Sequence, residues 1–192
     1  MPSQLEQPRA LTWEDLLAFP EDNQKREIIR GELIVSPGPS VWHQEVVLAI
    51  YRRLYAFAHA RQAGKVMTSP IDVRFSSYDV TQPDVLFIRA DRFRSLLTSD
   101  ARIAGAPDLV VEVISPTSRS IDCVRKFALY ADAGVPEYWL VDPEMRSLQI
   151  FTLEGDRYTQ LPAGAAGRVA SRVLPGLIVD PGWVFVDLES SS

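Results

Sequence analysis

Two carboxylates stand inside runs of apolar residues that read as buried strands. In "DLVVEVISPTSRSIDCVRK", residues 108–126, Glu112 lies among aliphatic residues that would cover both faces of a strand. In "QPDVLFI", Asp84 is flanked by apolar residues in the same way. If neighbouring strands brought the two carboxylates to about 4 Å, their repulsion would be about 4 kcal/mol at an effective dielectric of about 20. A divalent cation with oxygen ligands would turn that repulsion into a binding site. Each carboxylate alone is also compatible with an ion pair to an arginine or a hydrogen bond at a strand end.

A lysine follows the second carboxylate on a predicted helix. On the helical wheel, Lys126 lies at the border between the polar side and an apolar arc that contains Phe127 and Tyr130. From that border a lysine can lie along apolar surface and deliver its ammonium to the edge of a sheet. The alternative is an exposed helix pair with Asp122, worth only tenths of a kcal/mol. Periodicity alone favours the exposed pair.

Two further polar residues accompany the carboxylates. Ser40 can cap a helix over roughly residues 41–60, and His43 falls on the inward stripe of that helix. His43 is then either a hydrogen-bonded core histidine or a residue that lines a cleft. Gln82 shares a strand face with Asp84 and is expected to orient that carboxylate or an attacking water.

Composition excludes several classes of protein. The net charge of −5 and the pI near 5.1 argue against a nucleic-acid coat protein but allow an enzyme with a local basic groove. The single cysteine, Cys123, excludes an intramolecular disulfide and suits a reducing cytosol, so a cytoplasmic location is expected. We find no signal-peptide pattern, and no apolar run approaches the roughly 20 residues needed to span a bilayer, so no membrane association is expected. Phosphate-loop, dinucleotide-binding and nucleophile-elbow motifs are missing from the sequence.

The remaining pattern predicts one α/β domain over residues 11–187, with flexible ends at 1–10 and 188–192. A capping box, Thr12-x-x-Asp15, starts a short helix that stops at Pro20. The other expected elements are a hairpin around Arg30-Gly31, a hairpin of "SPIDVRF" and "QPDVLFI" joined by "SSYD", a helix from Ser118 or Ser120 to about Ala133 with Gly134 after it, a buried strand in "PEYWLVDP", and a hairpin around Gly155-Asp156.

Four segments together carry a resemblance to a known family. They are "REIIRGELIVSPGPSVWHQ", "VTQPDVLFI", "GAPDLVVEVISPTSRSIDCVRK" and "YADAGVPEYWLVDP". From about Leu11 to Asp187 the chain resembles the Uma-type endonucleases of bacteria, which are similar to the PD-(D/E)XK, or restriction-endonuclease-like, superfamily. The resemblance implies a core of helix, antiparallel β-meander, helix and strand, preceded here by an N-terminal helix and hairpin. It also implies metal-dependent hydrolysis of phosphodiester bonds, with Pro83-Asp84 as the "PD" element and Glu112 as the first residue of the (D/E)XK element.

One position departs from the motif. The lysine of the (D/E)XK element falls at Ile114, and the resemblance assigns its role to Lys126 on the following helix. Asp84 and Glu112 would hold Mg²⁺ or Mn²⁺ together with the backbone carbonyl of Val113, and Glu27 matches a further acidic residue of the family. The sequence therefore predicts a metal-dependent DNA endonuclease, and the resemblance suggests a homodimer. The alternative is a non-catalytic nuclease fold that binds nucleic acid or a protein partner.

Overall fold

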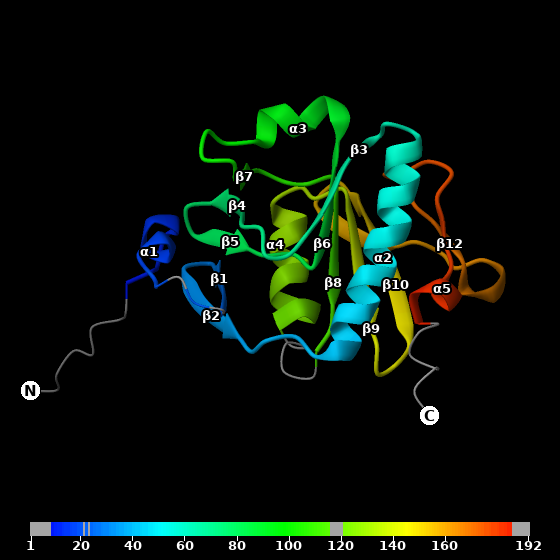
Figure 1. Cartoon of the computed structure of the whole chain (residues 1–192), viewed down its shortest axis with the longest axis horizontal. Helices are drawn as coiled ribbons and strands as arrows, with labels where there is room; N and C mark the ends of the chain where they lie inside the picture. The colour runs from blue at the N-terminus through cyan, green and yellow to red at the C-terminus, as the bar shows by residue number, and fades with distance from the viewer. Residues whose placement is uncertain (1–8, 21, 23, 116–120, 186–192) are drawn as a thin grey trace, which may run out of the picture.

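A six-stranded mixed sheet crosses the molecule and carries helices on both faces (Figure 1). The computed structural model describes residues 9–20, 22, 24–115 and 121–185, without the side chains of 121–123. In spatial order the strands of the large sheet are β11 (Arg157–Gln160), β10 (Ser147–Glu154), β9 (Glu137–Asp142), β8 (Leu109–Val113), β6 (Val85–Arg89) and β3 (Gly64–Thr68). Strands β8 and β9 pair in parallel, and the other neighbours in this sheet are antiparallel.

The order of elements confirms the predicted restriction-endonuclease-like core. Helix α2 (Val41–Ala60) precedes the antiparallel meander β3–β6–β8. Helix α4 (Phe127–Asp132) then carries the chain to β9, as a parallel pair requires a crossover connection. The predicted bounds of α2 are confirmed, and the Ser40 hydroxyl accepts a hydrogen bond from the His43 N–H at 3.2 Å.

A smaller sheet lies beside the large one and corrects one prediction. Its strands are β2 (Glu32–Ser36), β1 (Lys25–Ile29), β5 (Asp79–Thr81), β4 (Val73–Ser76) and β7 (Ile103–Ala104), in this spatial order. After the "SSYD" turn, β4 pairs with β5, whereas "QPDVLFI" enters the large sheet as β6. The predicted hairpin partner is therefore wrong. Pro83 has no N–H to donate to a ladder, so the small-sheet strand ends before it.

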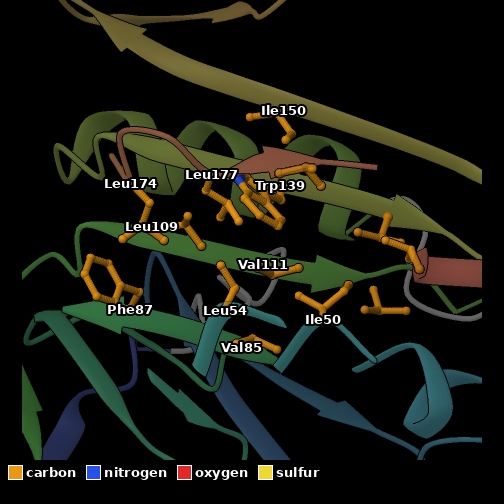
Figure 2. Packing of buried hydrophobic residues seen from close by; sticks show 14 of the residues in the cluster. Ile50, Leu54, Val85, Phe87, Leu109, Val111, Trp139, Ile150, Leu174 and Leu177 are labelled. Carbon is orange, nitrogen blue, oxygen red and sulfur yellow. The ribbon is translucent and has the colours of Figure 1, made fainter. Parts of the chain in front are cut away.

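The large sheet is covered on both faces, as the sequence of β8 predicts. Leu109, Val111 and Val113 face a core shared with α2 and the C-terminal segment, whereas Val110 and Ile114 face the core under α4. Figure 2 shows the first of these cores, in which Ile50 and Leu54 of α2 pack toward the sheet; the other labelled residues are Val85, Phe87, Leu109, Val111, Trp139, Ile150, Leu174 and Leu177. The even-numbered residues of the β8 segment therefore face the side of the sheet that α4 covers.

The remaining elements are short. They are α1 (Trp13–Leu17), α3 (Ala90–Leu96), the π-helix η1 (Ile121–Lys126), the 3₁₀-helix η2 (Ala165–Gly167), β12 (Val169–Ala170), β13 (Ile178–Val179) and α5 (Pro181–Phe185). The predicted capping box of α1 and the β1–β2 and β10–β11 hairpins are present. Arg30 and Gly31 take positive φ angles of 52° and 78°, which suits a tight hairpin turn. The predicted helix start at Ser118 or Ser120 lies outside the described residues. Within the described part of the chain, no helix has the length and apolar character to cross a membrane.

Candidate functional site

Three buried carboxylates from separate elements converge at one end of the large sheet. Asp84 directly precedes β6, Glu112 lies on β8, and Glu27 comes from β1 of the small sheet. Val85 pairs with Val111, so the antiparallel register places Asp84 beside the end of β8. There the backbone N–H of Val113 donates to Asp84 Oδ2 at 2.8 Å. The two carboxylates singled out in the sequence are thus brought together.

Lys126 lies between two of these carboxylates. Its Nζ is 3.1 Å from Glu112 Oε2 and 3.0 Å from Glu27 Oε1, and its side chain is 2% exposed. The alternative of an exposed helix pair with Asp122 is therefore wrong for Lys126, while the Asp122 side chain itself lies outside the described part of the chain. The helical wheel assumed α-helical spacing, but residues 121–126 form a π-helix. Its i→i+5 hydrogen bonds put more residues into each turn and change the face on which Lys126 emerges.

Tyr130 and Thr81 support the other oxygen of Glu112. The Tyr130 hydroxyl donates to Glu112 Oε1 at 2.5 Å and lies 3.0 Å from the Thr81 hydroxyl, which can donate to it in turn. Burial and the nearby Glu112 charge raise the pKa of Tyr130 well above its usual value, so the phenol stays protonated as a donor. The sequence places Tyr130 on the apolar arc next to Lys126 but gives no signal for this hydrogen bond.

A second lysine, missed in the sequence, reaches the site from β1. Lys25 Nζ lies 3.5 Å from Asp84 Oδ1 and 4.0 Å from Glu27 Oε1, and its side chain is 24% exposed. Burial raises the pKa of Asp84, but the charges of Lys25 and Lys126 and the interactions with His43 outweigh it and hold that pKa below its usual range. Asp84 is therefore an ionised carboxylate at neutral pH.

His43 connects the carboxylates to a cleft. Its Nε2 lies 3.2 Å from Asp84 Oδ2, and because a carboxylate can only accept, Nε2 carries the proton. Among the described residues, His43 Nδ1 is a buried side-chain atom without a hydrogen-bond partner. The cleft has a volume of about 490 Å³, and its lining residues are Ser40, Trp42, His43, Ile114, Ser115, Pro143, Glu144 and Arg146. His43 is thus hydrogen-bonded to Asp84 and also lines the cleft, so it has features of both alternatives predicted for it.

Gln82 does not reach Asp84 with its side chain. Its side-chain amide donates to Asp72 Oδ1 at 2.9 Å, while its backbone N–H donates to Glu27 Oε1 at 2.7 Å. The expectation that the Gln82 side chain orients Asp84 assumed a continuous strand. Pro83 interrupts that strand, so residues 82 and 84 no longer share a face. The contribution of Gln82 to the site is its backbone.

Comparison with known proteins finds a matching family and a structure with the same fold. A family model, Uma2, described as "Putative restriction endonuclease", matches residues 13–182. The chain belongs to the Uma2 family. A solved structure titled as a "putative nuclease belonging to DUF820" from Anabaena variabilis shares the fold with a TM-score of 0.76 at 18% sequence identity. That match covers 92% of this chain and 98% of the other. No curated protein matches the chain.

The donors of this Uma2 site fit a hard divalent cation with few protein ligands. Mg²⁺ is commonly held by one or two carboxylates and keeps several waters, and Asp84 and Glu112 supply two carboxylates. Within the described ranges, no three or more His, Cys, Asp or Glu side chains are arranged to hold a metal ion. Glu27 instead contacts Lys126 and the Gln82 backbone. A two-carboxylate site is thus the arrangement that these residues fit.

Proposed function

We propose that this protein is a metal-dependent endonuclease that hydrolyses phosphodiester bonds in DNA. The observation that carries the proposal is the meeting of Asp84 and Glu112 at the ends of neighbouring strands, with the Lys126 ammonium against Glu112. These are the residue types that phosphodiester hydrolysis needs: acidic ligands for a cation and a positive charge for an anionic substrate. Membership of the Uma2 family supports the same activity.

Asp84 and Glu112 would hold Mg²⁺ or Mn²⁺, with the Val113 carbonyl as a further predicted ligand, whereas Glu27 is held by Lys126 and the Gln82 backbone N–H. The bound cation would polarise the scissile phosphate and lower the pKa of a bound water. In this proposal Lys126 keeps Glu112 and Glu27 in place through its two ion pairs.

The surrounding residues orient the carboxylates before a substrate arrives. His43 and the Val113 N–H both hold Asp84 Oδ2, and Tyr130 holds Glu112 Oε1. Such outer contacts fix the ligand oxygens, and their loss commonly costs 10- to 100-fold in metal affinity or activity. The cleft beside His43 offers an approach for the substrate.

A second function is a nuclease fold that binds nucleic acid or a protein partner without cutting. Two observations favour it: lysine ammoniums lie against all three carboxylates, and Ile114 occupies the motif position of the lysine. The net charge of −5 is also modest support for a protein partner over DNA.

Cleavage assays separate the two functions. Plasmid and single-stranded DNA are incubated with Mg²⁺ or Mn²⁺, and with EDTA, using the wild type, Asp84→Asn and Glu112→Gln. The endonuclease predicts cleavage by the wild type, inhibition by EDTA and loss in both variants. Asp108→Asn is the matched control, because Asp108 is a buried acidic residue that pairs with Arg92 away from the site. If purified wild type binds DNA but leaves both substrates intact with either cation, the binding function replaces the nuclease.

The proposal also covers the cellular location and the oligomeric state. We propose a cytoplasmic protein that acts on DNA as a homodimer. Light scattering after size-exclusion chromatography tests the dimer, and a panel of small phosphodiesters tests whether DNA is the substrate. Turnover of a small phosphodiester in place of DNA would redirect the substrate assignment while keeping the hydrolytic chemistry.

A further inference from the structure

The chain contains few lysines, and two of its three lie at the carboxylates. The sequence contains seventeen arginines but only three lysines, Lys25, Lys65 and Lys126. Two of the three reach the carboxylate cluster, from β1 and from the end of η1. A lysine ammonium is a compact charge with rotatable donors, whereas the arginine guanidinium is a planar fork. This distribution indicates that the site calls for compact positive charges.

The two ammoniums at the site differ in how firmly they are held. Lys126 bridges Glu27 and Glu112 at 3.0 and 3.1 Å and is almost completely buried. Lys25 lies at the longer distances of 3.5 Å from Asp84 and 4.0 Å from Glu27, and about a quarter of its side chain is exposed. Lys126 could reach a phosphate in solvent only by breaking two buried ion pairs. Lys25 can turn its ammonium outward while staying on the same strand.

We propose that Lys25 is the lysine that contacts the phosphate of the substrate, and that Lys126 is a positioning residue for Glu27 and Glu112. This inference rests on the proposed nuclease function and names a substrate-binding residue that the sequence motif does not contain. The ligand group is a non-bridging oxygen of a phosphodiester. Lys25 lies against Asp84, so the same ammonium that balances this carboxylate stands at the solvent side of the catalytic cluster.

The neighbouring residues on β1 support this assignment. Arg26 points to a different partner, because its guanidinium makes two 2.6 Å contacts with Asp22. Glu27 is turned into the cluster towards Lys126. Lys25 is therefore the basic residue of this strand that is both near the carboxylates and accessible to a substrate.

A DNA-binding experiment in EDTA tests the contact without any metal. A short fluorescein-labelled duplex is titrated with wild type, Lys25→Gln, Lys25→Arg and Lys126→Gln over a range of salt concentrations. Loss of one phosphate contact lowers the slope of log K against log salt by about 0.9. Lys25→Gln should show this decrease, Lys25→Arg should keep the wild-type slope, and Lys126→Gln should keep it in the folded fraction. Thermal melts confirm that each variant is folded.

Lys65→Gln is the matched control for net charge, because Lys65 is exposed on β3. With Mn²⁺, Lys25→Gln should lower turnover by roughly 100- to 1,000-fold, the usual loss when one preorganised donor to a transition state is removed. Lys65→Gln should leave turnover unchanged. The inference is overturned if Lys25→Gln keeps the wild-type salt slope, or if Lys65→Gln lowers slope and turnover equally. A wild type that neither binds nor cleaves DNA overturns the proposed function itself, whereas a cleaving wild type with an unaffected Lys25→Gln overturns only the role of Lys25.

Discussion

Two fully buried glutamates lie on adjacent strands of the large sheet and are satisfied in opposite ways. Among the described residues, the donors to Glu137 of β9 are all neutral: Trp139 Nε1 at 2.7 Å, the Ser171 hydroxyl at 2.8 Å, and the backbone N–H groups of Arg172 and Val173 at 2.6 and 3.1 Å. Glu112 of β8 contacts a charged ammonium and a phenol.

The difference separates a structural carboxylate from one that we propose to be a metal ligand. The donors to Glu137 are fixed by the backbone and by packing, and they fasten the C-terminal segment to the sheet. Glu112 belongs to a cluster in which ammoniums and carboxylates balance each other's charges. A divalent cation can take over the positive charge that an ammonium supplies to Glu112, whereas the neutral donors around Glu137 supply no such charge. The following experiments test this contrast.

The largest effect is expected from removing the Lys126 ammonium. Lys126→Met keeps the apolar stem but leaves Glu27 and Glu112 buried without their shared partner, and breaking a buried ion pair typically costs about 3–5 kcal/mol. Urea denaturation measures the loss. Millimolar Mn²⁺ should restore more stability to Lys126→Met than it adds to the wild type, because the cation replaces the missing charge. Wild-type stability in Lys126→Met would contradict the description of this cluster.

A smaller loss is expected at the structural glutamate. Glu137→Gln turns an amide towards donors that need an acceptor, so we expect a loss of about 2–3 kcal/mol. In contrast to Lys126→Met, this variant should gain no extra stability from Mn²⁺. A specific Mn²⁺ rescue of Glu137→Gln would erase the distinction between the two glutamates.

Tyr130→Phe should cost about 1.5 kcal/mol, because it removes a hydrogen bond to a charged acceptor. It should also weaken metal affinity by roughly 10- to 100-fold, since Glu112 loses the group that orients it. Tyr158→Phe is the matched control, because its hydroxyl donates to the Val135 carbonyl at 2.8 Å away from the carboxylates. Calorimetric titration with Mn²⁺ should separate the two variants, and equal affinities would remove Tyr130 from the site.

The smallest expected effect is the change in stability that accompanies protonation of Asp84, and it is measurable only at acidic pH. The folded-state pKa of Asp84 is depressed by Lys25, His43 and Lys126 against the effect of burial. The unfolded chain therefore binds this proton first, and the stability from Asp84 is lost as the pH falls from the unfolded value of about 3.9 through the folded pKa. Melting temperatures of the wild type should fall more steeply below this pH than those of Asp84→Asn. Parallel curves would contradict the depressed pKa.

The sequence was sufficient where a local pattern has one physical solution. Apolar residues on both faces of the β8 segment require a central strand, and the Ser40 cap with its inward stripe predicted α2 at both ends. The sequence pairs the strand of "SPIDVRF" with the wrong partner, because the choice between two sheets depends on long-range packing. The position of the Lys126 side chain is ambiguous from the sequence, because no residue pattern predicts the π-helix.

Other members of the site were beyond local inference. Glu27 was identified only through the family resemblance, and Lys25 was not identified. Their contacts depend on how the small sheet lies against the large one. Glu112 and Glu137 are both buried in strands of the large sheet, and the structure shows how differently their partners surround them.

The hydrogen bond from Val113 to Asp84 has an evolutionary consequence. Replacing Asp84 by an apolar residue would leave a buried backbone N–H without its acceptor, which costs about 1–3 kcal/mol whether or not the protein cleaves anything. Selection for a stable fold would therefore retain this aspartate after a loss of catalysis. In a descendant of this protein, an intact Pro83-Asp84 would therefore show that the fold is conserved, not that the protein is active. After a loss of activity, the first residues to change would be those that contact only the substrate.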